Sequence, residues 1–152
     1  MRKLAAILAL SATPLTAQSV DPGTLPAVPA DRAVALFAAI CGDSLPNFDS
    51  ATDRMSANGI TDAAQTGTFY SSRENLSFKI TDGPGAGKTC SMVFATQDDT
   101  EAFVRAAFTL GAFQETQLGL AAPYRGSIVL LGDRPTSVGS VTYHNLRLLS
   151  QR

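Results

Sequence analysis

The chain has 152 residues, a formal net charge of −1 and 16% charged residues, with two cysteines, one histidine and no tryptophan. A chain of this length suits one domain, which buries roughly two-thirds of its unfolded surface without needing extra crosslinks. The chain has no basic run, so neither nucleic acid nor an anionic membrane surface is an expected partner, because both are bound through clustered positive charge.

The first 17 residues have the pattern of a secretory signal peptide. Arg2 and Lys3 precede a short apolar run at residues 4–10, and small residues then lead to a predicted cleavage site after Ala17. The apolar run is much shorter than the roughly 20 residues that cross a bilayer, so we expect no stable membrane insertion after cleavage. Cleavage leaves ten basic and thirteen acidic residues, a net charge of −3. The sequence therefore predicts a secreted or periplasmic protein.

Residues 18–30 form a predicted Pro-rich tether. Pro22, Pro26 and Pro29 favour an extended chain that links the signal peptide to the folded part. The patterned segments begin after this tether, so residues 31–152 are predicted to form a single α+β domain.

Two helices are predicted at the start of this domain. The first begins at Asp31 and ends before Gly42, and the second, shorter helix covers residues 48–58. Four residues of the first helix share one face at helical spacing: Val34, Phe37, Ile40 and Cys41. Cys41 is therefore expected to point toward the core.

Strand patterns dominate the rest of the chain, because apolar and polar residues alternate there. Five strands are predicted, at residues 68–70, 76–81, 90–95, 127–131 and 140–149. Residues 112–126 are predicted to be a long loop. In the last strand the apolar residues change phase near His144, which predicts either a β-bulge there or a strand that is buried on both faces at its end.

A third helix is predicted between the third and fourth strands, with its apolar residues at helical spacing up to Leu110. Asp98, Asp99 and Glu101 lie at its start. Carboxylates there cap free amides and oppose the helix dipole, so we interpret this cluster as helix capping and not as a cation site.

These elements give the order α-α-β-β-β-α-β-β. Short connections between neighbouring strands favour antiparallel pairing. The simplest layering is an α+β fold with a single antiparallel sheet of about five strands and helices packed on one face.

Cys41 and Cys90 are predicted to form a disulfide, because an even pair of cysteines in an exported chain meets an oxidising environment. The bond would fasten the first helix to the central hairpin. Two free, buried thiols are the alternative. Two cysteines and one histidine do not supply the four close ligands of a structural zinc site, and no metal or cofactor is predicted.

The Gly-rich turn at residues 82–89 contains Gly-Lys-Thr but does not fit a phosphate-binding loop. The spacing to the preceding glycine is one residue too short, and a strand pattern follows where a helix is required. We interpret the segment as a wide hairpin turn, with a partner-binding loop formed by Gly83, Gly85, Gly87 and Lys88 as the functional alternative.

His144, the only histidine, has no G-x-S-x-G motif to accompany it. A small hydrolase would need it to act with Asp133 or a serine. Tyrosines and arginines are the other candidates for a binding patch, although their spacing does not place them together: Tyr70, Tyr124, Tyr143, Arg73 and Arg125. Asn75 begins an Asn-Leu-Ser glycosylation sequon, and the sequence does not show whether it is used.

No catalytic constellation is evident, so the sequence favours a small secreted or periplasmic, non-enzymatic binding module that is stabilised by one disulfide and contacts a protein or another envelope component. The first alternative is a small-ligand-binding domain with an apolar cavity lined by Phe69, Phe78, Phe94 and Phe113. The second is the small hydrolase that uses His144. The sequence names neither a partner nor a ligand.

Overall fold

The computed structural model describes residues 25–83, 87–132 and 134–150. The predicted signal peptide and residues 18–24 of the predicted tether lie outside these ranges. The described helices are α1 (Ala30–Ile40), α2 (Ala51–Ala57) and α3 (Thr100–Ala107), with a short 3-10 helix, η2 (Gly42–Ser44), after α1. The described strands are β1 (Ile60–Thr61), β2 (Thr68–Ser71), β3 (Leu76–Asp82), β4 (Lys88–Thr96), β5 (Gln114–Thr116), β6 (Gly119–Tyr124), β7 (Ser127–Leu131), β8 (Thr136–Val138) and β9 (Val141–Leu149).

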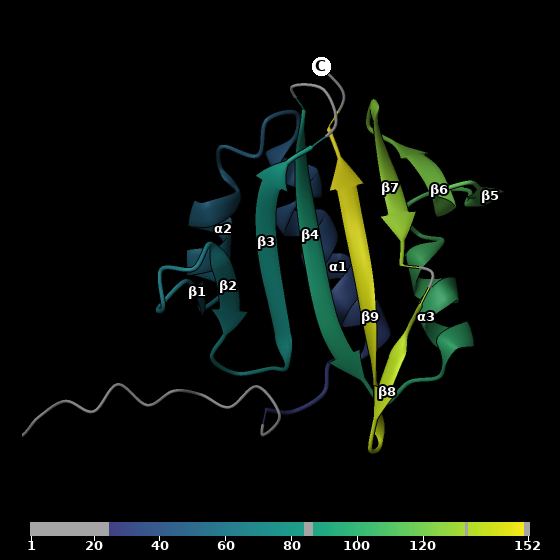
Figure 1. The fold of residues 1–152 in the computed structure, drawn as a ribbon, viewed down its shortest axis with the longest axis horizontal. Coiled ribbons are helices and arrows are strands. Elements are labelled where there is room, and N and C mark those ends of the chain that lie inside the picture. Colours follow the sequence, from purple (N-terminus) through teal and green to yellow (C-terminus); the bar gives the residue numbers. More distant parts are fainter. Residues whose placement is uncertain (1–24, 84–86, 133, 151–152) are drawn as a thin grey trace, which may run out of the picture.

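These nine described strands form one sheet in the order β1-β2-β3-β4-β9-β7-β6-β5, and β8 pairs with β9 beside this path (Figure 1). Each pairing is antiparallel. The last strand of the chain, β9, therefore lies near the middle of the sheet, between β4 and β7. It joins the hairpin formed by β3 and β4 to the meander formed by β5, β6 and β7.

The predicted sheet of about five strands, with the element order α-α-β-β-β-α-β-β, is wrong. The five predicted strands coincide with β2, β3, β4, β7 and β9, but β1, β5, β6 and β8 are additional. Three of these are only two or three residues long, and every residue of β5 and β8 is exposed. Strands this short show too little alternation to be detected. Residues 112–126, predicted to be a loop, contain the β5–β6 hairpin.

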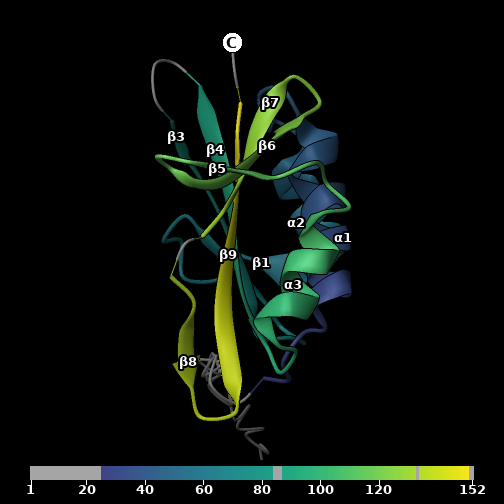
Figure 2. The ribbon, with the colours of Figure 1, turned by 90° about the vertical axis from the view of Figure 1, so that its right-hand side faces the viewer.

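The helices lie on one side of the sheet, as Figure 2 shows with the sheet seen edge-on. The core fills the space between the two layers. Its largest fully buried side chains come from both: Phe37, Ile40 and Met55 from the helices, and Phe78, Phe94, Met92, Leu146 and Leu148 from the sheet. The strands β3, β4 and β9 thus bury alternate residues against the helices.

The β9 strand has no bulge at His144. Its pairing with β4 is continuous from Thr96↔Thr142 to Thr89↔Leu149. His144 is buried in the same phase as Leu146 and Leu148. The phase change in the sequence arises because Val141 and Tyr143 are apolar or aromatic residues on the opposite face of the sheet.

The predicted disulfide between Cys41 and Cys90 is confirmed, and its two Cα atoms lie 5.8 Å apart. Both residues are fully buried. The bond joins the end of α1 to β4 and closes a loop with a sequence separation of 49 residues. In the chain-entropy model such a loop stabilises the fold by about 4 kcal/mol.

The acidic cluster before α3 acts at two helix N-termini. The Asp99 side chain accepts a hydrogen bond from the Ala102 amide at 2.7 Å, which caps α3. The Asp98 carboxylate accepts one from the Ala30 amide, also at 2.7 Å, and so caps α1 from a distant part of the chain. Glu101 pairs with Arg105 on the surface of α3. The predicted capping role is therefore shared between two helices.

Candidate binding face

The face of the sheet that points away from the helices is the candidate functional site. Its residues alternate with the buried residues of β3, β4 and β9, and cross-strand partners share a face. We call this surface the open face. In β2, β3, β4 and β9 it consists of Thr68, Tyr70, Ser77, Lys79, Thr81, Thr89, Ser91, Val93, Ala95, Val141, Tyr143, Asn145, Arg147 and Leu149.

Lys79 and Arg147 are the two charged residues of the open face as defined here, and both are exposed. They lie on either side of Ser91, because Ser91 pairs with Lys79 on β3 and with Arg147 on β9. Two strand spacings place their Cα atoms about 10 Å apart. Neither cation makes an ion pair with another residue that the structure describes. This surface is therefore positive although the chain as a whole is acidic.

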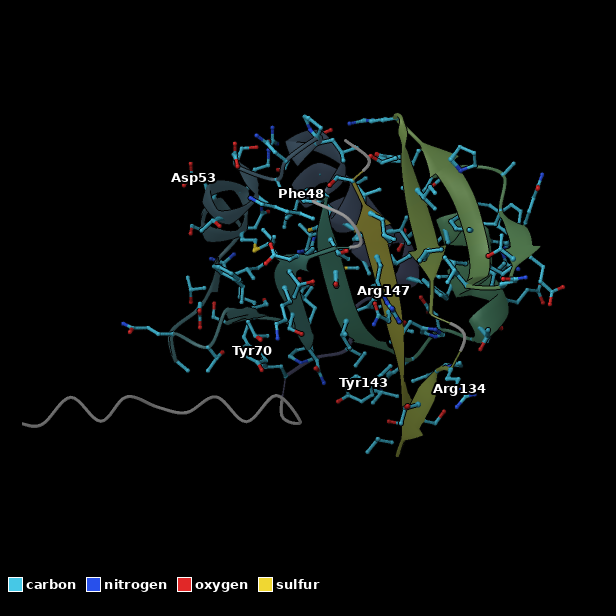
Figure 3. All side chains as sticks on the ribbon, turned by 45° about the horizontal axis from the view of Figure 1, so that its top comes forward. Phe48, Asp53, Tyr70, Arg134, Tyr143 and Arg147 are labelled. Atoms are coloured by element: carbon cyan, nitrogen blue, oxygen red, sulfur yellow. A yellow bond between two sulfur atoms is a disulfide. The ribbon has the colours of Figure 1, made fainter. Side chains whose placement is uncertain are left out.

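An apolar cleft of about 220 Å³ lies beside these cations, near the N-terminal end of β9. Tyr70, Val93 and Tyr143 line it, together with residues of the β2–β3 turn and Leu25. Tyr70 is 48% exposed and Val93 37% exposed. Figure 3 shows Tyr70, Tyr143 and Arg147 on the sheet, with Arg147 farther along β9 than Tyr143. The open face thus combines an apolar hollow with nearby positive charge.

Tyr143 is held in place by a bond across the sheet. Its Oη accepts a hydrogen bond of 3.0 Å from Nδ2 of Asn75, the residue directly before β3. The strand between them, β4, contributes Ala95 directly opposite Tyr143, and Ala95 is fully buried. The small side chain of Ala95 leaves room for the Tyr143 side chain to extend over β4 and reach Asn75. Asn75 itself is only 7% exposed, so its sequon is not presented at the surface.

Glu74 is the carboxylate that lines the cleft, and Arg32 neutralises it. The Glu74 oxygens accept hydrogen bonds from Arg32 Nε at 2.7 Å and Arg32 Nη2 at 3.0 Å. This bidentate pair raises the pKa of Arg32. Because Glu74 is paired with Arg32, it does not offset Lys79 and Arg147, and the open face keeps their positive charge.

The predicted aromatic and basic patch is divided between two faces. Tyr70 and Tyr143 meet in the cleft on the open face. Tyr124 and Arg125 instead line a shallow hollow beside α1 and α3. Arg125 donates a hydrogen bond of 2.6 Å to Asp43 and lies over the Tyr124 ring, which ties that hollow to η2. Arg73 is exposed in the turn before β3 and lines neither cleft.

His144 lies in the core and not in either cleft. It is 4% exposed, and its ring centroid is 4.2 Å from that of Phe103 and 5.8 Å from that of Phe94. Its Nε2 atom is buried without a hydrogen-bond partner among the described residues, and burial lowers the pKa of this imidazole. Asp133 lies outside the described residues. This geometry does not support the hydrolase hypothesis.

The phenylalanines of the expected apolar cavity are packing residues. Phe78 and Phe94 are fully buried in the core, Phe113 is 8% exposed, and Phe69 packs against the same cluster. None of the four lines the cleft on the open face or the hollow beside α1. A ligand cavity lined by these four residues is therefore not supported.

The Gly-rich turn joins β3 to β4 as a hairpin. The Gly83 amide donates a hydrogen bond of 2.8 Å to the Gly87 carbonyl, which closes the base of the turn. Lys88 begins β4, and its Nζ lies 3.8 Å from Asp49. Gly85 lies outside the described residues. A strand follows the turn, so no helix N-terminus is present to receive a phosphate.

Within the part of the chain that the structure describes, no three or more His, Cys, Asp or Glu side chains gather closely enough to hold a metal ion. None of the described helices is long and apolar enough to cross a membrane. Comparisons with protein-family models, with curated proteins and with solved structures gave no match.

Proposed function

We propose that the protein is a secreted or periplasmic, non-enzymatic interaction module that binds its partner through the open face of its sheet. The observation that carries this proposal is the uncovered face itself. Helices bury one side of β3, β4 and β9, while the other side presents exposed Tyr70 and Val93 beside Lys79 and Arg147. Exposed aromatic and apolar side chains next to arginine are enriched at protein interfaces.

The buried disulfide supports the proposed location. A bond between Cys41 and Cys90 forms and persists in an oxidising compartment, which is where the predicted signal peptide would send the chain. An exported module of this kind acts on other molecules of the envelope or the exterior.

The size of the cleft favours a macromolecular partner. Sites for small ligands enclose roughly 300–1,000 Å³, whereas this cleft is about 220 Å³ and is open to solvent on the sheet surface. It accommodates an apolar side chain that projects from a larger partner. Ser77 lines the cleft, and Ser91 lies in the next row of the open face between Lys79 and Arg147, so both hydroxyl groups can form hydrogen bonds around such an anchor.

Site-specific photocrosslinking in the producing cell tests this proposal. A benzophenone amino acid at Ser91 on the open face is expected to give a discrete crosslinked product. The same group at Asp53, an exposed residue of α2, is the matched control and is expected to give none. Equal crosslinking at both positions, or none at Ser91 in cells that contain the mature protein, would contradict the proposal.

A further inference from the structure

We propose that the partner presents an extended acidic polypeptide segment, whose apolar side chain enters the Tyr70–Val93–Tyr143 cleft while a nearby carboxylate pairs with Arg147 or Lys79. This inference rests on the proposed function and adds the chemistry of the partner. It follows from three properties of the open face: its charge, the spacing of its rows and the shape of its cleft.

Charge complementarity selects an acidic segment. After signal cleavage the chain has a net charge of −3, yet the open face contributes Lys79 and Arg147 and no carboxylate. Glu74, at the cleft, is already paired with Arg32. A guanidinium on a sheet surface binds a carboxylate through two parallel hydrogen bonds, which adds direction to the attraction.

The spacing of the rows selects an extended segment. Lys79, Ser91 and Arg147 lie side by side, and the next row toward the cleft contains Ser77, Val93 and Asn145. Successive rows are two residues apart along each strand, or about 6.7 Å. In an extended peptide, side chains two residues apart point to the same side with that same separation. One peptide face can therefore place a carboxylate over the cations and an apolar group over Val93.

The cleft selects an aromatic or branched aliphatic side chain. Tyr70, Tyr143 and Val93 line the cleft, together with Leu25 and residues of the β2–β3 turn. Tyr143 is fixed by its bond to Asn75, so one wall is rigid before the partner arrives. A preorganised wall lowers the entropy lost on binding.

A defined peptide tests the proposal. The probe is a fluorescein-labelled, end-blocked heptapeptide that contains aspartate, glycine and phenylalanine in that order, flanked by serine and glycine. Fluorescence anisotropy with the oxidised mature chain is expected to show saturable binding that weakens as sodium chloride rises from 50 to 300 mM, since exposed ion pairs are screened by salt. Peptides with lysine in place of aspartate, or alanine in place of phenylalanine, are expected to bind at least about fivefold more weakly.

Variants of the protein locate the site. Arg147→Gln and Tyr70→Ala change exposed side chains, so both variants are expected to fold. Each is expected to bind the aspartate peptide about fivefold more weakly than the parent does. Arg105→Gln removes an exposed arginine on α3 and is the matched control, with binding unchanged. Equal loss in all three variants would overturn the assignment to the open face.

Other results would overturn the acidic-segment proposal while leaving the binding face intact. The first is a crosslink at Ser91 without any binding of the aspartate peptide at millimolar concentration. The second is equal binding of the lysine peptide and the aspartate peptide. The third is a dimer of this chain that Arg147→Gln abolishes. The last result would identify a second copy of this chain as the occupant. Failure of both the crosslinking and the peptide experiment would instead contradict the proposed function.

Discussion

The two faces of the same sheet differ in almost every physical property. On the covered face, β3, β4 and β9 present Phe78, Phe94 and Leu146, all less than 2% exposed. One residue along each strand, the open face presents hydroxyl groups, two cations and an apolar cleft. Because side chains alternate along a strand, the same three strands serve stability on one face and recognition on the other. Substitutions at neighbouring positions should therefore have different consequences.

The sharpest contrast is expected between Phe94 and Val93, which are adjacent on β4. Phe94→Ala should lower the free energy of unfolding by about 3–5 kcal/mol, because Phe94 is fully buried and its ring packs against Phe103 and His144. Val93→Ala should cost about 1 kcal/mol or less, because Val93 is 37% exposed. Urea unfolding of both variants measures the difference. Similar losses in the two variants would break the distinction between the faces.

Removing the disulfide, which lies on the covered side of the sheet, is expected to have the second-largest effect on the free energy of unfolding. The double variant Cys41→Ala with Cys90→Ala is expected to lower the free energy of unfolding by about 2–4 kcal/mol. Without the disulfide, the unfolded chain is no longer closed into a loop between residues 49 positions apart, so it gains conformational entropy. Unfolding of the oxidised parent and of this variant gives the value. Binding of the acidic peptide to the variant that remains folded should be unchanged, because the sulfurs lie on the opposite side of β4 from Val93. A large loss of affinity in the folded fraction would show that the two faces are coupled.

Acid should produce the smallest of the three effects. Burial lowers the pKa of His144 in the folded protein, so below its ordinary value of about 6.5 the unfolded chain takes up a proton more readily than the folded one. The contribution of neutral His144 is therefore complete above about pH 6.5 and is lost as the pH falls toward the lowered folded pKa.

His144 is the only histidine, which makes this prediction easy to assign. Unfolding midpoints measured from pH 7.5 to pH 5 should fall with pH in the parent and fall less in His144→Phe, which cannot titrate. The same slope in both proteins would mean that carboxylates, and not the buried imidazole, govern stability over this range. Peptide binding should be insensitive to the substitution, because His144 belongs to the covered face.

Parts of the structure follow from local patterns. The apolar residues of α1 at helical spacing and the alternation in β3 and β4 are visible in the chain, and they place Cys41 and Cys90 on facing surfaces. The disulfide could be predicted because the chain has only two cysteines, which leaves one possible pairing, and because the helical spacing before Cys41 points it toward the core. The strands β5 and β8 could not be predicted, because three exposed residues carry no periodic signal and become strands only by pairing with β6 and β9.

The candidate site was hidden for a related reason. Lys79, Ser91 and Arg147 are dispersed over 69 positions of the sequence, and only the pairing of β3, β4 and β9 makes them neighbours. Likewise Tyr70 meets Tyr143 in one cleft, while Tyr124 faces the helices. An isolated exposed arginine or tyrosine in a strand gives no sign of which others it will join.

By itself, then, the sequence determined the core positions of the strongest elements and the pairing of its two cysteines, because each of these depends on local periodicity or on a single pair of residues. Export stays a prediction from the N-terminal segment. The tertiary structure decided the number of strands, the central place of β9, the burial of His144 and the composition of the open face. These depend on which strands hydrogen-bond to one another, and that choice is made by long-range packing that no local pattern encodes.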